Sequence, residues 1–513
     1  MRDVYNLGNS KELASWFAEH ITTPSANSRN IIESRASEKE ALERIAAVNQ
    51  LGDTMVMKTS YWQRVWVVQE VCLAQKVFFV YGPTLFIDED AVLYAHQMSG
   101  IKLASGMNNM LKARQRRFSE VMRLETLIEE FAAQMCTDPQ DKIYGLIGLA
   151  NDINAVDNSR NATEGDEDEG DMATMQYSGS EDVDFIIDYR RSFYDIWCDV
   201  VQYLFRCPYY FVPAHLEEDE GELARLRHER LTNLIRFAGL VQNTLQDGVE
   251  RELAQLAASS SASELGAQLR GPKLFGHHLV PARGYLAGEI LDLGPSYAAF
   301  IGSFRHQTAW RTKWRKHYRK EHELGQLREM EDRYAAKILN YSEADVARVA
   351  SIQGDSFVAF RTVDNGPLDD LTAARTTNKQ KIMQDVLKTL STLPSKSLTQ
   401  NAPGGEARRF LGTDRCMGVA PPGAAIGDWV IRFFDCDAAV VVRPNDASDP
   451  NTPCMLVGRA DVADILDRKG PHGYDKLGSL ALQRGYSDDP DHKRFDLVMD
   501  WHTLQRITAS ITT

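Results

Sequence analysis

Residues 61–82 read YWQRVWVVQEVCLAQKVFFVYG, and this stretch decides the fold that we predict. Ser60 is placed to cap a helix that runs to about Lys76. The apolar run VFFVY follows and stops at Gly82-Pro83, which is typical of a short buried strand. A helix followed directly by a buried strand is the order of elements typical of a parallel α/β sheet. We therefore expect an α/β fold in this part of the chain.

The second informative stretch is CTDPQDKIYGLIGLA, residues 136–150. Asp138 stands where a helix N-cap would, and Pro139 and Asp141 suit the first helical turn. An acidic stretch that is poor in large hydrophobic residues follows, so we predict that residues 151–183 form a disordered insertion. Order is expected to resume at FIIDY and in a helix that Ser192 can cap.

The length of 513 residues predicts about three domains, at roughly 150 residues per domain. We assign residues 1–205 to the α/β part, residues 206–405 to a mainly helical middle region and residues 406–513 to a β-rich C-terminal domain. In the last of these, residues 408–465 alternate short apolar runs with Gly, Pro and Asp turns. That pattern indicates a small antiparallel barrel or sandwich.

Composition narrows the class of protein. Apolar residues make up 43% of the chain and charged residues 25%, as in ordinary globular proteins. The net charge of -14 does not favour bulk attraction to nucleic acid or to an acidic membrane. The seven cysteines form no CxxC pair, and the N-terminus has no apolar signal core. We therefore expect reduced thiols, a cytoplasmic location and no membrane partner.

Three segments together resemble the fungal heterokaryon-incompatibility (HET) domain family. Residues 61–82 match its order of aromatic, Arg, Trp, Gln-Glu, Leu-Ala and a closing strand with Gly. DPQDKIYGLIGLA resembles the family's DPRDKIYALLGLA, and IDYRRSFYDIWCDVV resembles the IDYSKSVEEVYxDVA stretch that follows it. The resemblance covers about residues 55–205. It implies a partial TIR-like (flavodoxin-like) parallel sheet and a role in nonself recognition and regulated cell death.

The family's domain normally opens with segments like YxALSYxWG and WIDxLCINQxD, and neither is present here. We therefore expect an N-terminally truncated domain that shows little or no NAD cleavage by itself. The absent segments would supply the first strands of the sheet and the loops of a TIR-like site.

Glu70 is the candidate catalytic residue. On a helix it is surrounded by apolar neighbours in VWVVQEVCLA and has no Lys or Arg three or four residues away, so burial would make its charge costly. Some TIR domains cleave NAD with one glutamate in a Trp-Cys-x-x-Glu pattern, and Trp66 to Glu70 keeps that spacing without the Cys. A structural acid that bonds backbone groups or a distant Arg is the alternative, and the sequence leaves both open.

Weaker binding candidates surround Glu70. Trp66, Gln69 and Arg64 are candidates for holding NAD. Core packing is the alternative for the tryptophan, and Arg64 could pair with a phosphate or with Glu70, although the two lie on different helix faces. The histidines show no metal spacing, and no glycine-rich phosphate loop occurs. We therefore expect no metal and no cofactor, with NAD entering only as a substrate.

Two functional hypotheses follow. The chain is either a cell-death effector that acts through TIR-like NAD hydrolysis, or a noncatalytic interaction and oligomerisation module or decayed gene product. The expected partners are other incompatibility proteins or a second copy of the chain. Residues 304–320 interleave seven Lys or Arg with Trp310, Trp314 and Tyr318. We read that aromatic stripe as a buried helix face rather than as a grip on nucleic acid.

Overall fold

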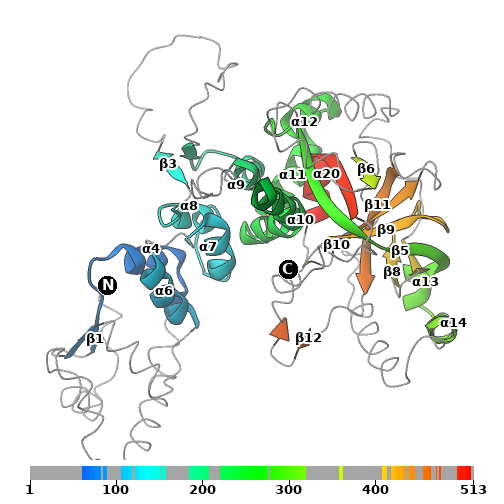
Figure 1. The fold of residues 1–513 in the computed structure, drawn as a ribbon, viewed down its shortest axis with the longest axis horizontal. Coiled ribbons are helices and arrows are strands. Elements are labelled where there is room, and N and C mark those ends of the chain that lie inside the picture. Colours follow the sequence, from blue (N-terminus) through cyan, green and yellow to red (C-terminus); the bar gives the residue numbers. More distant parts are fainter. Residues whose placement is uncertain are drawn as a thin grey trace, which may run out of the picture. The chain divides into compact units, whose positions relative to one another are not determined.

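Figure 1 shows the fold of the chain in a computed structural model. The structure describes residues 60–81, 85–88, 105–117, 122–151, 153–157, 184–206, 220–274, 278–318, 357–361, 407–412, 417–433, 436, 438–444, 454–463, 469–470, 473–474 and 494–509. The chain divides into two compact units, residues 1–190 and residues 191–513. Residues 1–59 lie outside the described residues.

The first unit holds short helices and two strand pairs. Helix α4 (Val65–Leu73) follows the 3-10 helix η2 (Ser60–Gln63). The other helices described in this unit are α6 (Ser105–Arg116), α7 (Leu124–Phe131) and α8 (Asp141–Ile147). The strands are β1 (Phe78–Tyr81), β2 (Leu85–Asp88), β3 (Asn154–Asp157) and β4 (Asp184–Ile187).

The core of this unit lies where α4 packs between α6 and α8. Helix α4 contributes Val65, Val67, Val68, Val71 and Cys72, all at most 5% exposed. Helix α7 contributes Leu124, Leu127, Ile128 and Phe131, whose spacing places them along one helical stripe. Each short helix therefore depends on its neighbours, because helices of this length are marginal alone.

The strands correct the expected parallel sheet. The strand after α4, β1, pairs antiparallel with β2. The helix and strand predicted here are therefore followed by a hairpin and not by a parallel sheet. Only β3 and β4 pair in parallel among the described residues. Strand β3 also lies inside the stretch expected to be disordered, because Ala155 and Val156 pair with Phe185 and Ile186. The rest of that stretch, from residue 158 to residue 183, lies outside the described residues.

An antiparallel sheet of eight strands organises the second unit, in the order β10-β9-β5-β14-β6-β11-β8-β7. Two further pairings, β10 with β11 and β5 with β7, close it into a barrel. The strands are β5 (Leu279–Ser296), β6 (Phe357–Arg361), β7 (Arg408–Gly412), β8 (Met417–Ala420), β9 (Trp429–Arg432), β10 (Ala438–Pro444), β11 (Cys454–Ala463) and β14 (Arg494–Asp500). A separate small hairpin joins β12 (Lys469–Gly470) to β13 (Gly473–Tyr474).

The long strand β5 connects much of the barrel. It pairs with β14 through residues 279–285, with β9 through residues 285–289 and with β7 through residues 290–296. Ile290 of β5 lies in a buried cluster with residues of five other strands, namely Phe410, Ala420, Val430, Ala439, Val441, Ala460 and Val462. Beside that core, Arg283 and Asp496 form a buried ion pair across β5 and β14, with Nε and Oδ1 2.7 Å apart.

Helices α10 and α20 contact strands of the barrel, and α9 packs against α10 and α11 (Figure 1). These are α9 (Phe193–Arg206), α10 (Glu220–Thr244), α11 (Gly248–Ser259) and α20 (Trp501–Thr508), and the unit also contains α12 (Ala262–Gln268), α13 (Tyr297–Ile301) and α14 (Phe304–Tyr318). Helix α20 contacts α10 and the strands β5, β10 and β14. Arg459 of β11 donates to the carbonyl of Ala509 at 2.6 Å and so caps the end of α20.

The structure contains an antiparallel sheet, as expected, and this sheet draws on more of the chain than residues 406–513. The barrel takes β5 and β6 from the region expected to be mainly helical, residues 206–405. The compact units also divide at residue 190 rather than at residue 205, so α9 belongs with the second unit. The described structure as a whole is mixed, with helices and a mainly antiparallel sheet.

Candidate functional site

The first segment, the second segment and the opening residues of the third, up to Arg190, meet within the first unit. The hydroxyl of Tyr189, in IDYRRS, donates to Oδ1 of Asp141, in DPQDK, at 2.8 Å. The hydroxyl of Tyr144 donates to the carbonyl of Asp188 at 3.1 Å, and the rings of Tyr144 and Tyr189 lie edge to face at 5.0 Å. The second and third segments are therefore fastened together by side chains of their own motifs.

The first segment is fastened to the second by close helix packing. An added Cβ on Gly145 of α8 would lie 3.4 Å from Val65 and 3.8 Å from the ring of Trp66, both on α4. The backbone N–H of Val65 donates to the carbonyl of Met135 at 3.0 Å, and Arg64 and Met135 form an isolated parallel bridge. The start of α4 is therefore fixed against the chain that leads into α8.

The polar residues of DPQDK serve as caps. Asp138 accepts a hydrogen bond from the backbone N–H of Gln140 at 3.0 Å, but α8 begins at Asp141 with Gln140 as its N-cap, two residues later than the capping pattern predicted. Lys142 is buried, and its Nζ donates to the carbonyl of Ala132 at 2.6 Å, just after α7 ends. Burial lowers the pKa of Lys142 and raises the pKa of Tyr189. These groups hold helices in place.

Glu70 is exposed, so the burial that would make its charge costly does not occur. Helix α4 turns its valines and Cys72 inward, and at 100° per residue Glu70 falls on the opposite arc with Trp66, Gln69 and Leu73. Its Oε2 accepts a hydrogen bond from the hydroxyl of Tyr61 at 3.0 Å. No ion pair of Glu70 with Lys or Arg occurs among the described residues, so Tyr61, which sequence reasoning missed, is the partner that orients it.

The outer face of α4 combines apolar surface with this carboxylate. Trp66 is 36% exposed and Leu73 is 57% exposed, although both belong to residue types that usually avoid water. Gln69 is half-buried beside Gly148, and Arg64 is exposed at the position before α4. The structure thus brings Trp66, Gln69 and Glu70 onto one face and leaves Arg64 at its end. Such a face can bind a partner through apolar contact and can accept hydrogen bonds.

Behind this face, α6 holds the end of α4 in a way that the sequence did not reveal. Arg114 is 3% exposed and donates to the carbonyls of Val71 at 2.9 Å and Gln75 at 3.1 Å, and also to that of Ala74. A guanidinium there satisfies carbonyls that a helix end leaves unpaired and offsets the negative end of the helix dipole. Arg114 therefore fixes the orientation of α4.

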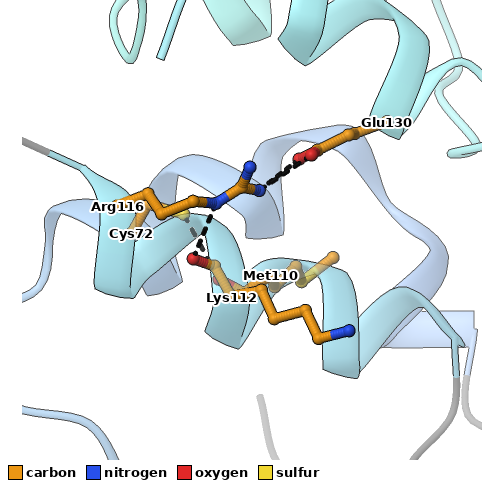
Figure 2. A network of polar contacts seen from close by, with 5 residues as sticks. All are labelled: Cys72, Met110, Lys112, Arg116 and Glu130. Atoms are coloured by element: carbon orange, nitrogen blue, oxygen red, sulfur yellow. Dashed lines mark hydrogen bonds and ion pairs between the residues drawn. The ribbon is translucent and has the colours of Figure 1, made fainter. Parts of the chain in front are cut away.

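Figure 2 shows a network of polar contacts among Cys72, Met110, Lys112, Arg116 and Glu130. Arg116 forms a two-pronged pair with Glu130 of α7 at 2.8 Å, and its Nε donates to the carbonyl of Lys112 at 3.2 Å. The thiol of Cys72 donates to the carbonyl of Met110 at 3.7 Å. Burial raises the pKa of Cys72 to about 11, so this thiol is not set up as a nucleophile at neutral pH.

Two searches of the described residues bear on other kinds of site. No group of three or more His, Cys, Asp or Glu is arranged to hold a metal ion within the described ranges. Within the same part of the chain, no helix combines the length and apolar character needed to cross a membrane. Comparisons with protein families, with curated proteins and with solved structures find no match for this chain.

Proposed function

We propose that the chain works as a heterokaryon-incompatibility domain protein, in which the exposed face of α4 binds a partner protein during nonself recognition. The resemblance of three segments to that family motivates the proposal. The observation that carries it is that the three segments interlock, through Asp141 and Tyr189 and through Gly145 and Trp66. Chance likeness of three separate stretches would not require their motif residues to contact one another.

Partner binding explains the outer face of α4 better than catalysis does. Exposed Trp66 and Leu73 are costly unless another surface covers them, and tryptophan is enriched among residues that carry binding energy. Glu70 is exposed and held by Tyr61 rather than enclosed in a water-free site. A polar residue that borders an apolar centre is the usual arrangement of an interface. The partner is a second incompatibility protein or a second copy of the chain.

NAD cleavage is the second candidate function, and one observation favours it. The carboxylate of Glu70 and the indole of Trp66 lie on the same accessible face of α4. There an aromatic ring could stack on nicotinamide while a carboxylate stabilised a ribosyl cation. A TIR-like site also uses the carboxyl ends of a parallel sheet, and β3 and β4 form the only parallel pair among the described residues. We therefore place this candidate second.

Expression of the full chain in a filamentous fungus tests the proposal. We expect cell death with the wild type and loss of killing with Trp66→Ala/Leu73→Ala, at unchanged protein level and melting temperature. The matched control is Leu291→Ala/Ile426→Ala, which removes two exposed apolar side chains from the barrel unit, 40% and 66% exposed. Equal killing by both double variants would refute partner binding by the α4 face. If the wild-type chain never kills, the proposed role in cell death is refuted.

A further inference from the structure

A corner between α13 and α14 holds two large apolar side chains in water. Ile301, the last residue of α13, is 45% exposed, and Phe304, the first of α14, is 80% exposed. The corner is well bonded, because Gln307 donates from Nε2 to the carbonyl of Phe300 at 3.1 Å and from its backbone N–H to the carbonyl of Ser303 at 3.0 Å. Regular structure, not a loose loop, therefore presents the Phe304 ring.

The helix behind this ring is strongly cationic. Its sequence, FRHQTAWRTKWRKHY, holds five Lys or Arg and no Asp or Glu, in a chain whose net charge is -14. Trp310 and Trp314 are 3% and 1% exposed, as the expected buried stripe requires, and they turn one face of α14 inward. Four of the cations, Arg305, Lys313, Arg315 and Lys316, are exposed, and Arg311 is half-buried.

Helical spacing brings the apolar tip and the cations together. Phe304, Arg311 and Arg315 recur at intervals of seven and four residues, so they follow one stripe along α14. Arg305 and Lys316 are exposed and follow the neighbouring stripe. Lys313 lies on the other flank, where it pairs with Asp292.

We propose that this corner, Ile301 and Phe304 with the basic face of α14, docks onto an anionic lipid surface. A small apolar tip with a collar of cations is the chemistry of interfacial membrane binding. Helix α14 carries cations and no acid, and this charge of one sign matches the negative surface of an anionic lipid layer. The buried tryptophans also offer no platform for stacking nucleic-acid bases.

This proposal revises the expectation of no membrane contact, which rested on the overall charge. Exposed charges more than about 10 Å away are largely screened at ordinary ionic strength, so a local patch acts on its own. The proposal also stands apart from the α4 face, because it uses a different helix in the other compact unit.

Cosedimentation of the full chain with vesicles tests the proposal. Vesicles of phosphatidylcholine and phosphatidylserine in equal amounts should pull the protein down, whereas vesicles of phosphatidylcholine alone should not. Arg305→Gln/Lys316→Gln should weaken binding by roughly 25-fold, at about 1 kcal/mol per cation near the surface. Phe304→Ser should weaken it by roughly tenfold through lost apolar burial. Raised salt should weaken the wild type as well.

The matched control is Arg270→Gln/Lys273→Gln, which removes two exposed cations from the same unit, away from the corner. Equal loss of binding in this control, or no binding of the wild type to either vesicle, would overturn the proposal. Tight binding to a single-stranded oligonucleotide that the corner variants abolish, with no vesicle binding, would reassign the patch to nucleic acid. Sedimentation without vesicles that the same variants abolish would reassign it to self-association.

Discussion

The hydroxyl of Tyr189 donates to Oδ1 of Asp141 across 48 residues of sequence, at 2.8 Å. This bond joins DPQDK to IDYRRS, and the hydroxyl of Tyr144 reinforces it by donating to the carbonyl of Asp188. The two motifs are therefore parts of one local structure. Their polar residues hold the two motifs together, so a catalytic role is not needed to explain them.

Tyr189→Phe should lower the free energy of unfolding of the first unit by about 1 kcal/mol, the net value of one hydrogen bond. Hydrogen exchange of the α8 amides in the full chain would report the loss locally. Asp141→Ala should cost a similar amount, and the double variant should cost clearly less than the sum. Simple additivity would show that the two side chains do not interact.

The sequence predicted a helix at α4 and another at α8, because apolar spacing is a local signal, but both helices begin later than the proposed caps Ser60 and Asp138 indicate. It could not predict that Glu70 faces outward. In VWVVQEVCLA almost every neighbour is apolar, so the pattern does not tell which arc of the helix meets a core. Only the packing of α6 and α8 decides that, and Arg114, which comes from α6, gives no signal in the quoted stretch.

Strand β5 was missed for a different reason. Its sequence, LVPARGYLAGEILDLGPS, holds Pro and Gly residues that normally indicate turns. The structure shows why Gly294 stands there, because a Cβ would come within 2.5 Å of the Trp310 ring. A strand that must approach other elements closely in a barrel uses glycine, and a local reading mistakes it for a turn.

Arg114→Met should lower the free energy of unfolding by about 2–3 kcal/mol, because buried carbonyls at the end of α4 lose their donor. Arg116→Met is the matched control on the same helix. Its pair with Glu130 is partly exposed, at 33% and 28%, so the loss should stay below about 1 kcal/mol. Urea unfolding would measure the loss in each variant, and hydrogen exchange of the α4 amides would locate it. Equal losses in the two variants would contradict the capping role of Arg114.

Gly106→Ala should destabilise the first unit, whereas Gly145→Ala should not. A Cβ on Gly106 would lie 2.6 Å from the backbone oxygen of Trp62, so the backbone must move, at a cost of about 1–3 kcal/mol. On Gly145 the nearest atom is 3.4 Å away, which is ordinary contact, and alanine favours the helix by up to about 1 kcal/mol. Thermal unfolding of the two variants would test this order. A lower melting temperature for Gly145→Ala than for Gly106→Ala would contradict the close packing of α6 on η2.

His502 should make the chain less stable in mild acid. Burial, helped by the nearby Arg506, lowers its pKa to about 4, while Asp500 acts in the opposite direction. Between about pH 6.5 and about pH 4 the unfolded chain binds a proton that the folded chain does not, so stability falls as the pH falls. Between these pH values, the free energy of unfolding of His502→Gln should fall less than that of the wild type. An equal fall in both proteins would contradict the prediction.

Glu70→Gln in the fungal expression assay tests most directly whether the α4 face recognises a partner rather than catalyses a reaction. The amide keeps the shape of the side chain and an oxygen that can accept the bond from Tyr61, but it removes the charge. Killing and cellular NAD should be measured together, with the melting temperature of the purified variant as the control for folding. We predict that the variant kills as the wild type does, with the same NAD level. A folded variant that no longer kills and no longer depletes NAD would contradict the account and establish Glu70 as catalytic.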